Sequence, residues 1–317
     1  RSTLFPYTTL FRSTNFATEK GLSVIVAGND EVVTPFCAGR ERARALVTTE
    51  VIEMGEHPTE AIRTKKDSSI VRGCAAVRDG EADGFFSAGS TGAVFAAASL
   101  GVGRIAGVKR PCIATALPGA TGRSTVLLDM GANADVRPDM LVQFAQMGRA
   151  YSRVVVGVDD PTVALLSNGS EDTKGSSAVV AAHTALAALG ESWFAGNCEG
   201  TDLLAGRFDV IVTDGFTGNV ALKSLEGTAK FLLGELKGAI GDSKRAAVGA
   251  LMIKPALKDL SQKLSGDAYG GAIFLGLKAP VLIGHGATSA EAVKNGTLAC
   301  ARAHDSRLVD RIAAEVA

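Results

Sequence analysis

Residues 209–223, DVIVTDGFTGNVALK, combine an apolar strand with polar side chains that could bind a substrate. The run 209–213 is rich in β-branched residues and is typical of a buried strand, which Asp214 and Gly215 interrupt before a helical pattern begins at Asn219. In open α/β sheets ligands bind beyond the carboxyl ends of strands, and helix N-termini favour anions. Asp214, Thr217, Gly218 and Asn219 are therefore expected where a substrate can be held, and the pair Gly218 and Asn219 suits an anion; an ordinary helix cap is the alternative.

A second polar segment, residues 167–175, follows the apolar run 163–166 and contains Lys174 between glycines. A lysine can hold an anion and neutralise its charge, and a side-chain amide can donate a hydrogen bond to one. We expect Lys174 and Asn219 to face one pocket although 45 positions separate them. The alternative is that each residue only caps a strand or helix end.

Residues 56–70 form a polar run with three cations and two hydroxyls close together: Arg63, Lys65, Lys66, Ser68 and Ser69. Cations and hydroxyls together suit a phosphate or an acidic partner. Solvated surface is the usual alternative for such a run.

The composition excludes several classes of protein. Lys plus Arg equals Asp plus Glu at 33 each, which disfavours a nucleic-acid partner. Five cysteines without a C-x-x-C pair indicate a reducing compartment, so we expect a cytoplasmic protein. No apolar run reaches the roughly 18 residues of a spanning helix.

Familiar cofactor motifs are also missing. Residues 169–176 resemble a phosphate-binding P-loop, but Lys174 and Gly175 stand in the reverse order, and the glycines at 101–107 have the wrong spacing for a dinucleotide fingerprint. No zinc-protease, serine-hydrolase or Cys/His ligand pattern occurs. We therefore expect neither a metal nor a cofactor.

The rest of the chain alternates strands and helices, which predicts a largely parallel sheet covered on both faces. Small polar residues follow several strands, and we expect these strand ends to meet at one edge of the sheet. Three such groups are Ser87, Gly89, Thr91 and Gly92; Asp129, Asn133 and Asp135; and the segment 284–289 with His285. Strands are also expected at 23–27 and 47–54.

Taken in order, the motifs at 63–70, 87–93, 128–135, 169–175, 197–200, 214–223, 269–272 and 284–286 resemble the PlsX family of bacterial phosphate acyltransferases. The resemblance covers residues 20–303. It implies a three-layer α/β/α sandwich, similar to isocitrate and isopropylmalate dehydrogenases and to phosphate acetyltransferases. It also implies transfer of a long-chain acyl group from acyl carrier protein to inorganic phosphate, giving acyl phosphate for phospholipid synthesis.

By this resemblance Lys174 and Asn219 are expected to be catalytic, with His285 a weaker candidate. The expected substrate- and phosphate-binding residues are Arg63, Lys65, Lys66, Ser68, Ser69, Ser87, Gly89, Thr91, Gly92, Asp129, Asn133, Asp135, Asp214, Gly218 and Lys223. A thiol leaving group has a pKa of about 8.5 and needs little help from a general acid. Ser90, Ala134, Ile273 and Ala287 depart from the family pattern.

The family also opens with a strand ending in Asp-Ala-Met-Gly-Gly-Asp, which is missing here. Residues 3–13 instead match a translated sequencing adaptor, so we interpret residues 1–13 as non-native and expect them to lack stable packing. Residues 14–317 are then expected to form a single α/β/α domain without its first strand, in which case activity of this chain is in question.

Residues 219–264 show two helical patterns separated by Gly241 and Asp242, which predicts a helical hairpin. Plain core packing is one interpretation of its apolar positions. The resemblance implies that the hairpin builds a homodimer and offers an apolar tip near 251–257 to the membrane surface. It also implies a downstream glycerol-3-phosphate acyltransferase that uses the product.

Two other functions remain open. One is a phosphate acetyl- or butyryltransferase that uses acyl-coenzyme A on the same fold. The other is a non-catalytic scaffold at the membrane surface, which retention of Lys174 and Asn219 disfavours.

Overall fold

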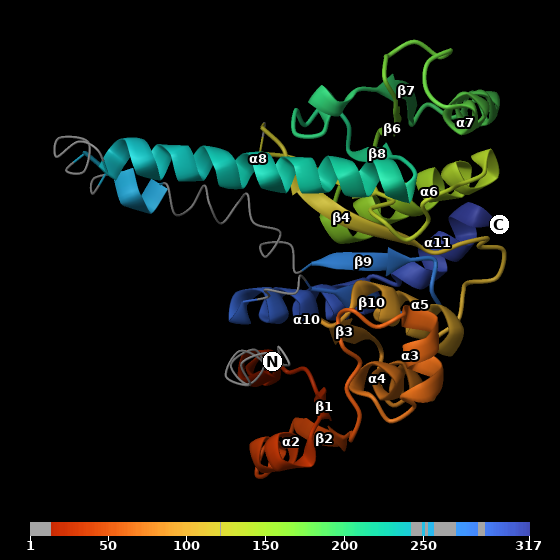
Figure 1. The fold of residues 1–317 in the computed structure, drawn as a ribbon. Helices are drawn as coiled ribbons and strands as arrows, with labels where there is room; N and C mark the ends of the chain where they lie inside the picture. The colour runs from red at the N-terminus through yellow and green to blue at the C-terminus, as the bar shows by residue number, and fades with distance from the viewer. Residues whose placement is uncertain (1–13, 121, 242–248, 251–252, 257–270, 285–288) are drawn as a thin grey trace.

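The computed structural model describes residues 14–120, 122–241, 249–250, 253–256, 271–284 and 289–317. Within them the main sheet runs in the order β3–β10–β9–β4–β5–β8–β6–β7 (Figure 1). Its strands are β3 (Phe85–Ser87), β10 (Val281–Ile283), β9 (Ala272–Leu275), β4 (Cys112–Pro118), β5 (Ser124–Leu128), β8 (Val210–Val212), β6 (Val163–Leu166) and β7 (Phe194–Cys198).

Helices cover both faces of this sheet, so the fold is the predicted three-layer α/β/α sandwich. One face packs against α6 (Pro138–Tyr151), α7 (Ser177–Ala188), α10 (Ala290–Asp305) and α11 (Leu308–Val316). The other packs against α3 (Pro58–Thr64), α4 (Ser69–Arg78), α5 (Thr91–Gly101) and α8 (Gly215–Gly241). Successive strand residues alternate between the two cores: Val126 and Leu128 belong to the first and Leu127 to the second.

The sheet is parallel at both ends and antiparallel in the middle. β3 pairs parallel with β10, and β5, β8, β6 and β7 form a parallel block. Between them, β10–β9, β9–β4 and β4–β5 are antiparallel. These three reversals place the carboxyl ends of β3 and β10 at the opposite edge from those of β5, β8 and β6. The polar ends of β5, β8 and β6 therefore share one edge as expected, but the expectation is wrong for the ends of β3 and β10.

The N-terminal part forms a small separate unit. β1 (Val24–Gly28) and β2 (Ala43–Val47) pair in parallel, and α2 (Asp30–Cys37) packs on them around Val26, Val33 and Phe36. The strand expected at 47–54 is wrong, because the chain leaves the sheet after Val47. Beyond it the Thr49 amide and hydroxyl both donate to the Asp67 carboxylate, at 3.0 and 2.7 Å, and so anchor this segment to the start of α4.

Helix α8 is 27 residues long and extends past the edge of the sheet (Figure 1). It begins at Gly215 rather than Asn219, because the Asp214 carboxylate accepts hydrogen bonds from the Thr217 amide and hydroxyl, both at 2.8 Å. Of the second helix of the expected hairpin, only 249–250 and 253–256 are described, and they are helical. Residues 1–13, whose packing was in question, lie outside the described residues.

Candidate active site

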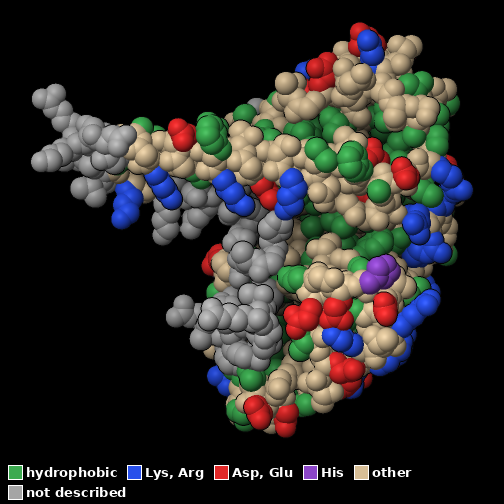
Figure 2. All heavy atoms as spheres, viewed as in Figure 1, with side chains coloured by type: hydrophobic (Ala, Val, Ile, Leu, Met, Phe, Trp, Pro, Cys, Tyr) green, Lys and Arg blue, Asp and Glu red, His purple; other side chains and the backbone are tan. Residues whose placement is uncertain are grey.

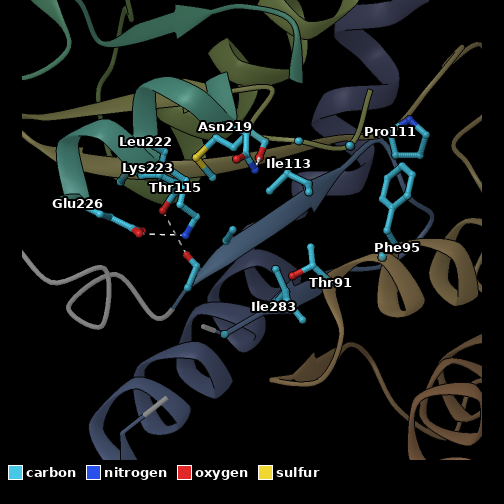
Figure 3. Close-up of a pocket in the computed structure, with 18 of the residues that line it drawn as sticks. Thr91, Phe95, Pro111, Ile113, Thr115, Asn219, Leu222, Lys223, Glu226 and Ile283 are labelled. Carbon is cyan, nitrogen blue, oxygen red and sulfur yellow. Dashed lines mark hydrogen bonds and ion pairs between the residues drawn. The ribbon is translucent and has the colours of Figure 1, made fainter. Parts of the chain in front are cut away.

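A cleft of about 910 Å³ lies between α5 and α8 (Figure 3). Phe95 and Ala96 line it from α5, Leu222 lines it from α8, and Ile113 and Ile283 come from the sheet. A mostly apolar cleft of this size accommodates a sizeable apolar ligand with a few polar groups that fix its orientation.

The cleft connects the two opposite edges of the sheet. Thr91 and Gly92, which follow β3, line one end, while Gly131, which follows β5, and Asn219 line the other. The polar strand ends predicted from sequence thus contribute to one cleft, although they do not share one edge. The antiparallel β4 runs between the two ends and supplies Ile113 and Thr115 to the lining.

The turn after β5 is organised by a buried carboxylate. Asp129 Oδ1 accepts from the amides of Ile113 and Ala132 at 2.9 and 3.1 Å. Its Oδ2 accepts from the amide and the side-chain Nδ2 of Asn133, at 2.8 and 2.9 Å. Burial raises the pKa of Asp129, while these four donors act in the opposite direction. Asp129 is fully buried, so it holds the turn in shape rather than touching a ligand directly.

Asn219 rests on this turn at the polar end of the cleft. Its Nδ2 donates to the Met130 carbonyl at 3.3 Å, and the side chain is exposed toward the cleft (Figure 3). Gly131 has φ +127°, and a Cβ there would lie 2.9 Å from Asn219 Nδ2. A Cβ at Gly218 would lie 1.9 Å from the Asp129 carbonyl oxygen. The start of α8 therefore fits against the turn only with glycine at both positions.

Two arginines that the sequence did not single out also line the cleft. Arg110 Nε donates to Asn133 Oδ1 at 3.1 Å, and the Arg104 guanidinium donates to the Lys109 carbonyl. Both are oriented by neutral oxygens, and neither forms an ion pair with a carboxylate in the described part of the chain. Guanidinium groups of this kind suit an anion such as phosphate. The available signal was the basic pair at 109–110, directly before the apolar run of β4.

Lys174 lies outside the lining of this cleft. It is exposed in the loop after β6, where its amide donates to the Glu171 carbonyl at 3.1 Å and Asn197 Nδ2 donates to the same oxygen at 2.7 Å. β8 separates β5 from β6, so the ends of these two strands are about 10 Å apart. Ser167 Oγ, at the end of β6, is buried without a hydrogen-bond partner among the described residues.

The basic run at 63–70 is largely engaged in local structure. Lys65 Nζ pairs with Glu56 Oε1 at 2.5 Å and donates to the Val51 carbonyl at 2.6 Å. This hydrogen bond from Lys65 is the main cause that lowers the pKa of Glu56. Ser68 is buried and caps α4 by accepting from the Val71 amide at 3.4 Å. Arg63, Lys66 and Ser69 lie nearby without lining the cleft.

The other predicted residues fall into three groups. Lys223 lines the cleft and pairs with Glu226 at 2.9 Å. Ser87 accepts from the Gly89 amide at 3.2 Å after β3, Asp214 caps α8, and the exposed Asp135 lies beyond the turn after β5. His285 lies outside the described residues.

Comparison with known proteins agrees with this fold. A phosphotransacetylase from Streptococcus pyogenes superposes with a TM-score of 0.64 at 17% sequence identity, covering 95% of this chain and 92% of that one. A 4-hydroxythreonine-4-phosphate dehydrogenase from Klebsiella pneumoniae superposes with a TM-score of 0.50 at 13% identity, covering 97% and 95%. These likenesses support the predicted α/β fold, which is shared by transacylases and dehydrogenases.

Sequence similarity is closer. Residues 13–311 match the family described as "Fatty acid synthesis protein". A phosphate acyltransferase from Limosilactobacillus reuteri is 47% identical over 273 residues, covering 84% of this chain and 80% of the relative. One from Pelotomaculum thermopropionicum is 46% identical over 299 residues, covering 93% and 86%. Fold and relatives together define an enzyme of the acyltransferase class. The chain belongs to the fatty acid synthesis protein family, which confirms the family predicted from its motifs.

Proposed function

We propose that this protein transfers a long-chain acyl group from acyl carrier protein to inorganic phosphate, giving acyl phosphate for phospholipid synthesis. The observation that carries the proposal is a large apolar cleft with Arg104, Arg110 and Asn219 at one end. An apolar cleft suits a long acyl chain, while two arginines that have no carboxylate partner among the described residues suit phosphate. The names of the relatives, phosphate acyltransferases, agree with both substrates.

In the proposed reaction a phosphate oxygen attacks the thioester carbonyl carbon. A carbon–oxygen bond forms, the carbon–sulfur bond breaks, and the carrier leaves as a thiolate. Arg104 and Arg110 hold the phosphate near the turn after β5. Asn219 Nδ2 donates to the developing oxyanion or to phosphate, and a donor fixed before reaction stabilises the transition state more than the ground state.

Lys174 is proposed to neutralise charge on the phosphate as the bond forms. Its loop follows β6, two strands from the turn that supports Asn219, and a lysine side chain extends several ångströms from its backbone. His285 is kept as a weaker catalytic candidate on the strength of its motif. The remaining predicted binding residues are proposed to shape the loops around these groups.

The wider setting is also a proposal. Exposed apolar residues on α8, Phe231 and Leu232 among them, support a homodimer interface along that helix. Half-exposed Ile253 supports contact of the hairpin tip with a membrane surface.

None of the helices in the described part of the chain has the length and apolarity that a membrane span requires. All five cysteines are unpaired, which supports the cytoplasm. The product would be used by a glycerol-3-phosphate acyltransferase.

The structural likeness to phosphotransacetylases supports one competing donor, acyl-coenzyme A. The test incubates the protein with phosphate and either long-chain acyl carrier protein or acyl-coenzyme A, and measures acyl phosphate by mass spectrometry. We expect acyl phosphate and free carrier thiol in equal amounts, with a higher kcat/KM for the carrier-bound donor. Preference for a short acyl-coenzyme A would favour the competing function, and no acyl phosphate from either donor would refute the proposal.

A further inference from the structure

Lysine recurs at every seventh position of α8, at Lys223, Lys230 and Lys237. A straight helix drifts by only about 20° per seven residues, so these three side chains lie on one side of the helix. All three are exposed. Figure 2 shows Lys and Arg side chains in blue along one edge of this helix. We call Lys223, Lys230 and Lys237 the lysine row.

The lysine row begins at the cleft and leads away from it. Lys223 lines the cleft and pairs with Glu226, whereas Lys230 and Lys237 form no ion pair with any residue that the structure describes. Asn219 precedes Lys223 by four residues and so lies on the same side of α8. At about 1.5 Å per residue, Lys230 is about 17 Å and Lys237 about 27 Å from Asn219 along the helix axis.

We propose that the lysine row is the docking surface for the protein part of the acyl donor, and that the donor presents an acidic face to it. The inference rests on the proposed function, because it assumes a donor whose acyl group is attached to a carrier protein. A carrier held at Lys230 and Lys237 would extend its thioester along α8 to Asn219. The acyl chain would then enter the cleft between α5 and α8.

The side of α8 that carries the row fits a protein partner better than a membrane. Its other members include the polar Asn219 and Glu226 and the partly buried Leu233. The exposed Phe231 and Leu236 each adjoin a lysine of the row in sequence and so point about 100° away around the helix. A helix that lies in a membrane interface places its exposed apolar residues together on the side that enters the lipid. Here the exposed apolar residues Phe231 and Leu236 point away from the lysine row, and the row begins at the cleft, which Lys223 lines.

Exposed lysines at the rim of an interface mainly raise the rate at which an acidic partner associates, and salt screens this attraction. The test variant is Lys230→Gln/Lys237→Gln, which keeps the helix and leaves Lys223 in place. The matched control is Lys20→Gln/Lys278→Gln, which changes net charge equally at exposed positions away from α8. Initial rates are measured at low and high salt with an acyl carrier protein donor and with acyl-pantetheine, an uncharged donor without a protein.

For Lys230→Gln/Lys237→Gln we expect KM for the carrier-bound donor to rise about tenfold at low salt with kcat little changed, a difference that shrinks at high salt. KM for acyl-pantetheine should stay within twofold, and the control should resemble wild type with both donors.

Three outcomes would overturn the inference: an unchanged KM for the carrier-bound donor, an equal rise with acyl-pantetheine, or an equal rise in the control. Loss of binding to anionic vesicles with unchanged KM would assign the row to a membrane instead. If the wild-type protein forms no acyl phosphate from the carrier-bound donor, the proposed function itself fails, which is a separate result.

Discussion

The turn after β5 and the loop after β6 are held in different ways. In the first, the buried Asp129 carboxylate accepts four hydrogen bonds that fix the turn. Asn219 donates a hydrogen bond to the Met130 carbonyl of this turn. In the second, Lys174 is exposed, and among the described residues backbone hydrogen bonds and the Asn197 side chain order the loop. The comparison indicates that the turn under Asn219 is fixed before substrate arrives, whereas the exposed Lys174 side chain would need the substrate to position it if it acts as proposed.

The largest expected effect comes from removing the two proposed catalytic side chains. Asn219→Ala and Lys174→Ala should each lower kcat by on the order of 10²- to 10³-fold, because each removes a donor to the transition state. If both act on one transition state, the double variant should be much less than multiplicatively worse.

Both variants should fold normally. If each residue is only a cap, its loss would cost about 1 kcal/mol of stability and leave turnover per folded enzyme nearly intact. The rate per folded protein and the melting temperature, measured together, separate these cases for each residue.

Gly218→Ala tests whether the fixed turn depends on close packing with α8. The added Cβ would overlap the Asp129 carbonyl oxygen, so we expect a destabilisation of about 3 kcal/mol and a large loss of activity. Gly227→Ala is the control on the same helix, since nothing lies within 4 Å of its Cβ position. The control should gain about 0.5–1 kcal/mol from helix propensity. Equal urea midpoints for the two variants would show that the turn tolerates displacement.

Arg110→Gln separates phosphate binding from acyl binding at the fixed end. Loss of a charged hydrogen-bond donor should raise KM for phosphate about tenfold, with KM for the acyl donor little changed. Initial rates over a range of phosphate concentrations measure this effect. A rise in KM for the acyl donor alone would place phosphate elsewhere, and the Lys174 loop would become the leading site.

Ala96→Trp narrows the apolar part of the cleft without touching either loop. Each methylene of the acyl chain displaced from the cleft should weaken binding by about 0.8 kcal/mol, which raises KM about fourfold. KM should therefore rise for long-chain donors and stay unchanged for short-chain donors. Ala188→Trp, at an exposed position near the end of α7, is the control. Equal KM values for all chain lengths in Ala96→Trp would place the acyl chain outside the cleft.

Much of this arrangement could be predicted from the sequence because it depends on local pattern. The strand at residues 210–212 and the helix that follows it come from a β-branched run and a change of periodicity, and the alternation of elements predicts the layers. Strand direction was not predicted, because β4 and β9 were not expected as strands. The signal is local: only five residues join β4 to β5 and β9 to β10, too few for a parallel crossover. That is why strand ends assigned to one edge occupy two.

The site residues also divide into those that local sequence predicts and those that depend on the tertiary fold. Asn219 could be predicted because its motif combines a strand end with a helix start. Arg110 could not, because it precedes an ordinary apolar strand and is oriented by the Asn133 side chain, 23 positions away in the sequence. Lys65 illustrates the opposite case. Its charge suggested a phosphate site, but the fold brings Glu56 and the Val51 carbonyl to it.

The claim that the cleft between α5 and α8 holds the acyl chain can be tested directly by photo-crosslinking. A long-chain acyl donor with a diazirine near the end of the chain is bound, irradiated, and its attachment sites are mapped by peptide mass spectrometry. We predict labels within Thr91–Gly101 and Gly215–Gly241, competed by unlabelled donor. Competed labels confined to α6 or α11, on the other face of the sheet, would contradict the account.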